Sequence, residues 1–252
     1  MSLPLVKYVL KAAIRDRLVL SLLVILLVGS SLATFLGSSV ITEKDQFTAV
    51  FAGGGLRIVS IFGLALFVVF FVRRSFESKD IEYLLSRPLS RLSILYSYAF
   101  AFSLLAILIE LAVGLTVFSV APHLFGYGHI LWVVSIMVEA IIMVNVALFF
   151  SMYISSSANA CMATFAVYVL GRLMGQLLGI SDSTLVDSTG LYSMALQLVS
   201  IITPRLDLLG QTSWLIYGAD GAYGLDDILI QGGVFSALVL LAASYDFIKR
   251  QF

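Results

Sequence analysis

Six long runs of apolar residues dominate the chain, and short polar stretches separate them. They cover residues 18–39, 54–72, 94–120, 130–154, 158–180 and 228–248. About 20 apolar residues in a helix suffice to cross the roughly 30 Å of hydrocarbon in a membrane. The runs lack the apolar–polar alternation of a barrel strand. The pattern therefore predicts an all-α integral membrane protein with six transmembrane helices.

The second run has the least distinct start. Arg57 and three consecutive glycines, Gly53, Gly54 and Gly55, stand there, whereas no charged residue interrupts residues 58–72. We therefore expect this helix to begin near residue 54.

Composition supports a membrane protein and narrows its chemistry. Of the 252 residues, 60% are hydrophobic and 12% are charged, whereas soluble domains carry about 25% charged residues. The balance of 15 basic and 15 acidic residues excludes nucleic-acid binding as a main role. A single cysteine, Cys161, excludes an internal disulfide, and with two histidines it leaves too few ligands for a Cys/His zinc site. We expect one transmembrane domain over residues 1–252, with no cofactor or metal on this chain.

Basic residues predict the orientation, since they remain on the cytoplasmic side. The N-terminal segment, the second connection and the C-terminus carry Lys7, Lys11, Arg15, Arg17, Arg73, Arg74, Lys79, Arg87, Arg91, Lys249 and Arg250. The connection 181–227 has one basic residue, Arg205, and six aspartates. Both termini are therefore expected in the cytoplasm, and connection 181–227 outside.

The N-terminal segment, residues 1–17, has the pattern of an interfacial helix. Leu3, Val6, Leu10 and Ile14 share one face, while lysines and arginines share another. An ordinary basic flank is the alternative. The first run could also be a cleaved signal peptide, but 17 residues is long for the basic region before its apolar core, and removing the run would reverse the predicted orientation.

The cytoplasmic connection, residues 73–93, contains apolar residues that a simple tether would not need. Ile81, Leu84 and Leu85 have helical spacing, and Pro88 disfavours helix at Arg87. One or two helical turns should end there, and the third span should begin after Ser90. The alternative is a charged reverse turn between spans.

This connection resembles the segment after span two in the type-2 ABC exporter permease family. The matching residues are Glu82, Leu84, Leu85, Ser86, Arg87, Pro88, Ser90 and Arg91. The layout of the whole chain is also similar: an N-terminal interfacial elbow, six spans, cytoplasmic termini and a long outer connection before the last span.

The resemblance implies that the connection is a coupling helix seated in a cleft of a separate cytoplasmic ATPase subunit. The ATPase-coupling residues would be Ile81, Glu82, Leu84, Leu85, Arg87 and Arg91. The resemblance further implies that two permease chains, as a homodimer or heterodimer, form the translocation pathway in the cell (inner) membrane. The sequence has no G-x-x-x-x-G-K-[ST] phosphate cradle. ATP and Mg²⁺ would therefore bind the partner ATPase, and this chain would not itself be an enzyme.

The outer connection, residues 181–227, predicts two short helices at the outer interface. One apolar side runs through residues 191–202 and ends before Pro204. A second apolar group, residues 208–217, includes Trp214 and Tyr217, which are typical interfacial anchors.

Three ionisable residues stand inside apolar runs: Glu110, Glu139 and Arg172. Counting 1.5 Å per residue from the cytoplasmic ends puts all three at a similar depth, so they could meet in one layer. An arginine between two carboxylates would lower their desolvation cost. We favour a structural ion pair over a role in handling substrate or protons, and both stay open.

The fifth run carries Gly171, Gly175 and Gly179 on one helical stripe, which is typical of a helix-packing face. Its partner could lie in the same chain or in a second copy; the family resemblance suggests contact with the first span of the other subunit. Taken together, the sequence predicts the permease subunit of an ABC exporter. The alternatives are a secondary carrier that uses Glu110 and Glu139 for protons, a structural subunit of a membrane complex, and a membrane-embedded enzyme.

Overall fold

The computed structural model describes residues 2–78, 90–181, 190–219 and 223–249, and this part of the chain is helical, without strands. Six helices are long and apolar enough to cross a membrane. They are α2 (Leu18–Ser38), α3 (Lys44–Glu77), α5 (Arg91–Val120), α6 (Tyr127–Tyr153), α7 (Ser157–Ser181) and α10 (Leu225–Lys249). The predicted class, an all-α multi-pass membrane protein with six spans, is confirmed.

Five shorter helices complete the described chain: α1 (Leu3–Arg15), η1 (Pro122–Leu124), α8 (Gly190–Ile202), η2 (Leu206–Leu208) and α9 (Trp214–Tyr217). The helix predicted over residues 191–202 is thus present as α8, which ends two residues before Pro204. The second apolar group of the outer connection folds into the short elements η2 and α9.

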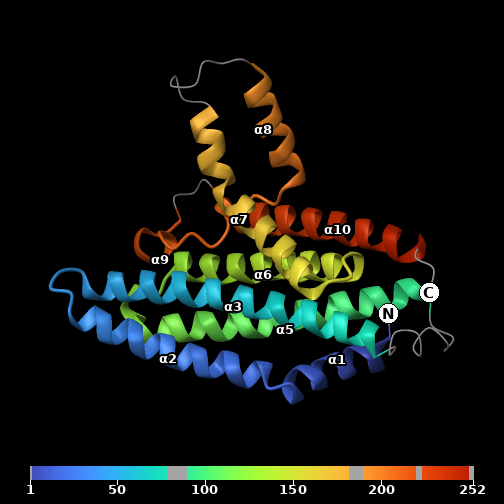
Figure 1. Ribbon diagram of the computed structural model, residues 1–252. Helices are drawn as coiled ribbons and strands as arrows, with labels where there is room; N and C mark the ends of the chain where they lie inside the picture. Colours follow the sequence, from blue (N-terminus) through green and yellow to red (C-terminus); the bar gives the residue numbers. More distant parts are fainter. Residues whose placement is uncertain (1, 79–89, 182–189, 220–222, 250–252) are drawn as a thin grey trace.

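The long helices form a bundle around α6 (Figure 1). Helices α2, α3, α5, α6 and α10 run lengthwise in it, and α6 packs against α3, α5, α7 and α10. The largest fully buried side chains include Trp132 of α6, Tyr98 and Phe102 of α5, and Phe247 of α10. Since α6 is surrounded on several sides, polar side chains on it are shielded from lipid.

Helix α3 is longer than the sequence predicts. It begins at Lys44 rather than near residue 54, so the three glycines lie inside the helix. A Cβ atom on Gly53 would lie 2.9 Å from Leu215 and 3.2 Å from the Trp132 ring. Gly53 therefore allows close packing at this point of the bundle, and the three glycines do not mark the end of the helix. In consequence, Arg57 lies well within α3.

Helix α1 packs against α5 and α2 through buried residues Leu5, Val6, Val9 and Ala13. Of the apolar face predicted for it, Val6 is buried, whereas Leu3 and Ile14 are 65% and 69% exposed. The helix itself is confirmed, and its position at a membrane surface stays a prediction. Exposed apolar residues beside exposed lysines are what such a position requires.

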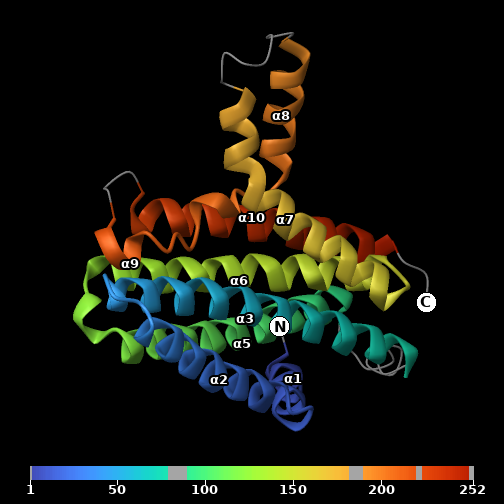
Figure 2. The same ribbon diagram turned by 60° about the vertical axis from the view of Figure 1, so that its left-hand side comes forward.

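Helix α7 runs obliquely, and its C-terminal part extends away from the bundle together with α8 (Figures 1 and 2). After α8 the chain returns to the bundle, where η2 packs against α7 and α9 packs against α6 and α3. This return brings residues 204–213, named here the inserted segment, into contact with three of the long helices.

Four chain segments lie at one end of the bundle (Figure 1): the start of α1, the end of α3, the start of α5 and the end of α10. Arg74 of α3 lies 3.8 Å from Asp16, beside the α1–α2 junction. Arg91 of α5 donates to the carbonyl of Ile248 in α10 at 3.2 Å. We name this the basic end, because the helices that begin or end there carry Lys7, Lys11, Arg15, Arg73, Arg74, Arg91 and Lys249.

Candidate functional site

A buried charged centre lies between α3, α5, α6 and α7. It consists of Arg57 on α3, Glu110 on α5, Glu139 on α6 and Arg172 on α7. Both glutamates have no exposed surface, and the side chains of Arg57 and Arg172 are 11% and 18% exposed. Charges within spanning helices are costly and usually pair with one another or with backbone carbonyls.

Arg172 binds both a carboxylate and the backbone of the inserted segment. Its Nη2 atom lies 2.6 and 2.7 Å from the two carboxylate oxygens of Glu139. Its Nη1 atom donates to the carbonyls of Leu206 and Leu209, each at 2.7 Å. The arginine therefore ties α6 and α7 to the inserted segment.

Arg57 is a second cation in the centre. Its Nε atom lies 4.0 Å from Glu139 Oε2, and its Nη1 atom donates to the carbonyl of Gly210. The sequence analysis placed Arg57 at the indistinct start of the second apolar run and did not predict that it contacts Glu139 and Gly210. The signal was present, because a helix that continues through the glycines places Arg57 about 20 Å along its axis, at 1.5 Å per residue.

Gly210 is the point of closest approach between the inserted segment and the centre. Its φ is +58°, and a Cβ atom there would lie 2.8 Å from Arg57 Nη1 and 2.9 Å from Glu139 Oε2. Its N–H donates to the Ser135 hydroxyl on α6. The inserted segment thus has several backbone groups bonded to side chains of the bundle, which non-helical backbone at membrane depth requires.

Glu110 has different surroundings from Glu139. Its Oε1 atom lies 2.7 Å from the Ser60 hydroxyl, and its Oε2 atom is buried without a hydrogen-bond partner in the described structure. Among the described ion pairs, Arg172 joins Glu139 and not Glu110. One arginine bridging the two glutamates, as the sequence suggested, is therefore not the observed arrangement.

The Ser60 hydroxyl can bond to Glu110 whether the carboxyl group is ionised or protonated. The Ser60 hydroxyl lies 2.7 Å from Glu110 Oε1 and 2.8 Å from the carbonyl of Arg57, but it has one proton to donate. If that proton goes to the carbonyl, a protonated Glu110 can donate to Ser60 instead. Ser60 can therefore donate to an ionised Glu110 or accept from a protonated one, and neither arrangement requires a change in the Glu139–Arg172 pair.

The predicted glycine face packs on the inserted segment. A Cβ atom on Gly171 would lie 2.6 Å from the carbonyl oxygen of Pro204, and one on Gly175 would lie 2.5 Å from Asp207 Oδ2, whereas Gly179 has open space around it. Two of the three glycines thus have an intramolecular partner. That partner is irregular chain and a 3₁₀ turn, and not a long helix.

Five of the six predicted ATPase-coupling residues, Ile81, Glu82, Leu84, Leu85 and Arg87, lie outside the described residues. The sixth, Arg91, is the first residue of α5 and bonds to α10. Ser90 caps this helix by accepting from the Ser93 N–H at 3.2 Å. The start of the third span, predicted just after Ser90, is confirmed.

In the described part of the chain, no cluster of three or more His, Cys, Asp or Glu residues could hold a metal ion. No family model matches the chain, and no curated protein is similar enough to it to count as a match.

Proposed function

We propose that the chain is the membrane-spanning permease subunit of an ABC exporter, with a separate cytoplasmic ATPase and a second permease chain as partners. The observation that carries the proposal is the segment Glu82, Leu84, Leu85, Ser86, Arg87, Pro88, Ser90 and Arg91 between the second and third spans. This segment joins the end of α3 to the start of α5, and both belong to the basic end (Figure 1), which supports a cytoplasmic location.

The contacts of the charged centre offer a route by which movement of the coupling segment, residues 73–93, would reach the spans. Helices α3 and α5 flank the coupling segment, and they carry Ser60 and Glu110, whose side chains bond to each other. A displacement of the segment by an ATPase would move these two helices relative to each other at the level of the centre. The Glu139–Arg172 pair would keep α6, α7 and the inserted segment together during such a motion.

Energy for transport would come from the partner subunit, which would bind ATP and Mg²⁺. The sequence of this chain offers no Walker A run for the phosphates. A gene for a Walker A ATPase beside the gene of this chain would identify the candidate partner.

The deciding experiment replaces two residues of the coupling segment, Leu84→Asp with Leu85→Asp. The double variant should insert and fold normally but lose co-purification with the ATPase and its transport-linked stimulation, since buried apolar anchors carry most of such an interface. A matched control is Val40→Asp with Ile41→Asp in the connection between α2 and α3, at the other end of the bundle, where Ile41 is fully exposed. Full co-purification of the Leu84→Asp, Leu85→Asp chain would contradict the proposal.

A proton-coupled secondary carrier is the second candidate, and Glu110 supports it. This carboxyl group is fully buried and has one oxygen without a partner in the described structure. Transport by the purified chain in vesicles without any ATPase, driven by a pH gradient and abolished by Glu110→Gln, would favour the carrier.

A further inference from the structure

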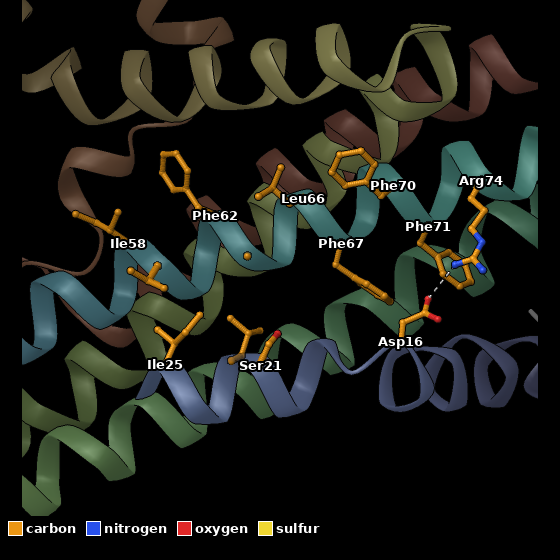
Figure 3. A pocket seen from close by; sticks show the side chains of 13 residues that line it. Asp16, Ser21, Ile25, Ile58, Phe62, Leu66, Phe67, Phe70, Phe71 and Arg74 are labelled. Carbon is orange, nitrogen blue, oxygen red and sulfur yellow. Dashed lines mark ion pairs between the residues drawn. The ribbon is translucent and has the colours of Figure 1, made fainter. Parts of the chain in front are cut away.

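A groove on the outside of the bundle runs between α2 and α3 (Figure 3). It has a volume of about 790 Å³. Apolar side chains of both helices line most of it, among them Ile25 on α2 and Ile58 and Phe67 on α3. Both helices are long and apolar enough to span a membrane, so lipid would face the groove once the chain is inserted.

The groove becomes polar where it reaches the basic end. Asp16 and Arg74 form an ion pair there, with a distance of 3.8 Å, and the Arg74 side chain is 70% exposed (Figure 3). A smaller pocket of about 240 Å³ adjoins this end and shares Asp16, Phe71 and Arg74 with the groove. Tyr8 and Arg15 of α1 also line this second pocket.

The polar end carries an excess of positive charge. Arg15, Arg74 and Asp16 are the charged residues that line the groove and the smaller pocket. The neighbouring exposed charges are Lys11, Arg17 and Glu77, whereas Arg73 is buried. Asp16 is occupied by Arg74, so a bound anion would find Arg15 and the exposed part of Arg74 available.

The length of the groove fits a lipid tail. From Arg74 to Ile58 along α3 the groove extends about 24 Å at 1.5 Å per residue. One leaflet contributes about 15 Å to the roughly 30 Å of hydrocarbon. A tail that starts at the level of Arg74 therefore stays inside the groove throughout its leaflet.

We propose that this groove is a binding site for one anionic glycerophospholipid. One acyl chain lies between α2 and α3, and the phosphate lies in the smaller pocket, where Arg15 and Arg74 bind it. The lipid comes from the leaflet at the basic end. The lipid contacts α1, α2 and α3 at the position where the direct packing of these three helices leaves a gap. Net positive charge beside an apolar groove selects an anionic over a zwitterionic headgroup.

The experiment uses the full-length protein, incorporated into vesicles of equal parts phosphatidylglycerol and phosphatidylcholine and then extracted in a neutral detergent. Native mass spectrometry counts the lipids that each chain retains. The wild type should retain one phosphatidylglycerol and exclude phosphatidylcholine. Arg15→Gln with Arg74→Gln should weaken retention by about fivefold for each charge removed. Lys7→Gln with Lys249→Gln, which removes two charges at the same end away from the groove, should change nothing.

A second pair of variants tests the tail. Val59→Trp fills the groove and should abolish retention, whereas Leu27→Trp, on an exposed α2 position outside the groove, should not. If Val59→Trp fails to fold, Ile25→Trp fills the groove from the other side. Equal retention of both lipids would mean unspecific boundary lipid and would overturn the proposal. The proposal is also wrong if the wild type retains no lipid and its oligomeric state is changed by Val59→Trp. A second copy of the chain would then occupy the groove.

Discussion

At the scale of single residues, Gly210 is restricted both by its backbone conformation and by its crowded surroundings. Its positive φ disfavours any side chain, and its Cβ position is also crowded by Arg57 and Glu139. Gly210→Ala should therefore destabilise the protein by about 2–4 kcal/mol, of which about 1–2 kcal/mol is backbone strain. Thermal unfolding in detergent measures the loss. A loss of only about 1–2 kcal/mol, which backbone strain alone explains, would show that the close approach to Arg57 and Glu139 costs nothing.

Arg172 should be among the most sensitive residues. Arg172→Leu leaves Glu139 buried with Arg57, at 4.0 Å, as its remaining described ion-pair partner. It also removes the arginine donor from two carbonyls, of which Leu206 keeps the Leu209 N–H as a donor. We expect a loss of about 3–5 kcal/mol, as for a broken buried ion pair. Adding Glu139→Leu should recover only part of it, since the Leu209 carbonyl still lacks the Arg172 donor and the Leu206 carbonyl has lost one of its two donors. Complete recovery in unfolding experiments would mean that these backbone contacts contribute nothing.

The two buried glutamates should respond differently to the same substitution. Glu110→Gln keeps the size and the hydrogen-bonding ability of a protonated carboxyl, so it should change stability by less than about 1 kcal/mol. Glu139→Gln removes the charge that two arginines face and should cost several times more. Unfolding of both variants under the same conditions gives the comparison. A larger loss for Glu110→Gln would show that Glu110 is held as an anion.

At the scale of elements, two positions of the glycine stripe of α7 should respond differently to the same substitution. Gly175→Leu should destabilise the protein, because its side chain would collide with Asp207 of the inserted segment, while Gly179→Leu should leave the monomer fold intact. Unfolding and size-exclusion chromatography separate the outcomes. If Gly179→Leu disrupts a dimer, this position contacts a second copy, as the family resemblance suggests for the fifth span. Equal destabilisation by both variants would contradict the packing described here.

The sequence predicts the helices far better than it predicts the charged centre. Apolar runs define six spans within a few residues, except at α3, where glycines that serve close packing resemble a boundary. Depth counting correctly brings Glu139 near Arg172. It cannot reveal that Ser135, Arg57 and Gly210 join them, because that depends on the path of the inserted segment after α8. Such contacts join residues 75 and 153 positions apart, and no local pattern encodes them.

At the scale of the whole molecule, the basic end defines a topology that labelling can test. The chain has one cysteine, Cys161, which is buried, so Cys161→Ala gives a background without reactive thiols. In it, Ser188→Cys should react with a membrane-impermeant maleimide only from outside the cell, and Ser2→Cys only after the membrane is opened. The physical reason is the retention of lysines and arginines on the cytoplasmic side. Labelling of Ser188→Cys from the cytoplasmic side would reverse the topology. It would also place the segment between α3 and α5 outside, beyond the reach of any cytoplasmic ATPase, and the carrier would then become the better explanation.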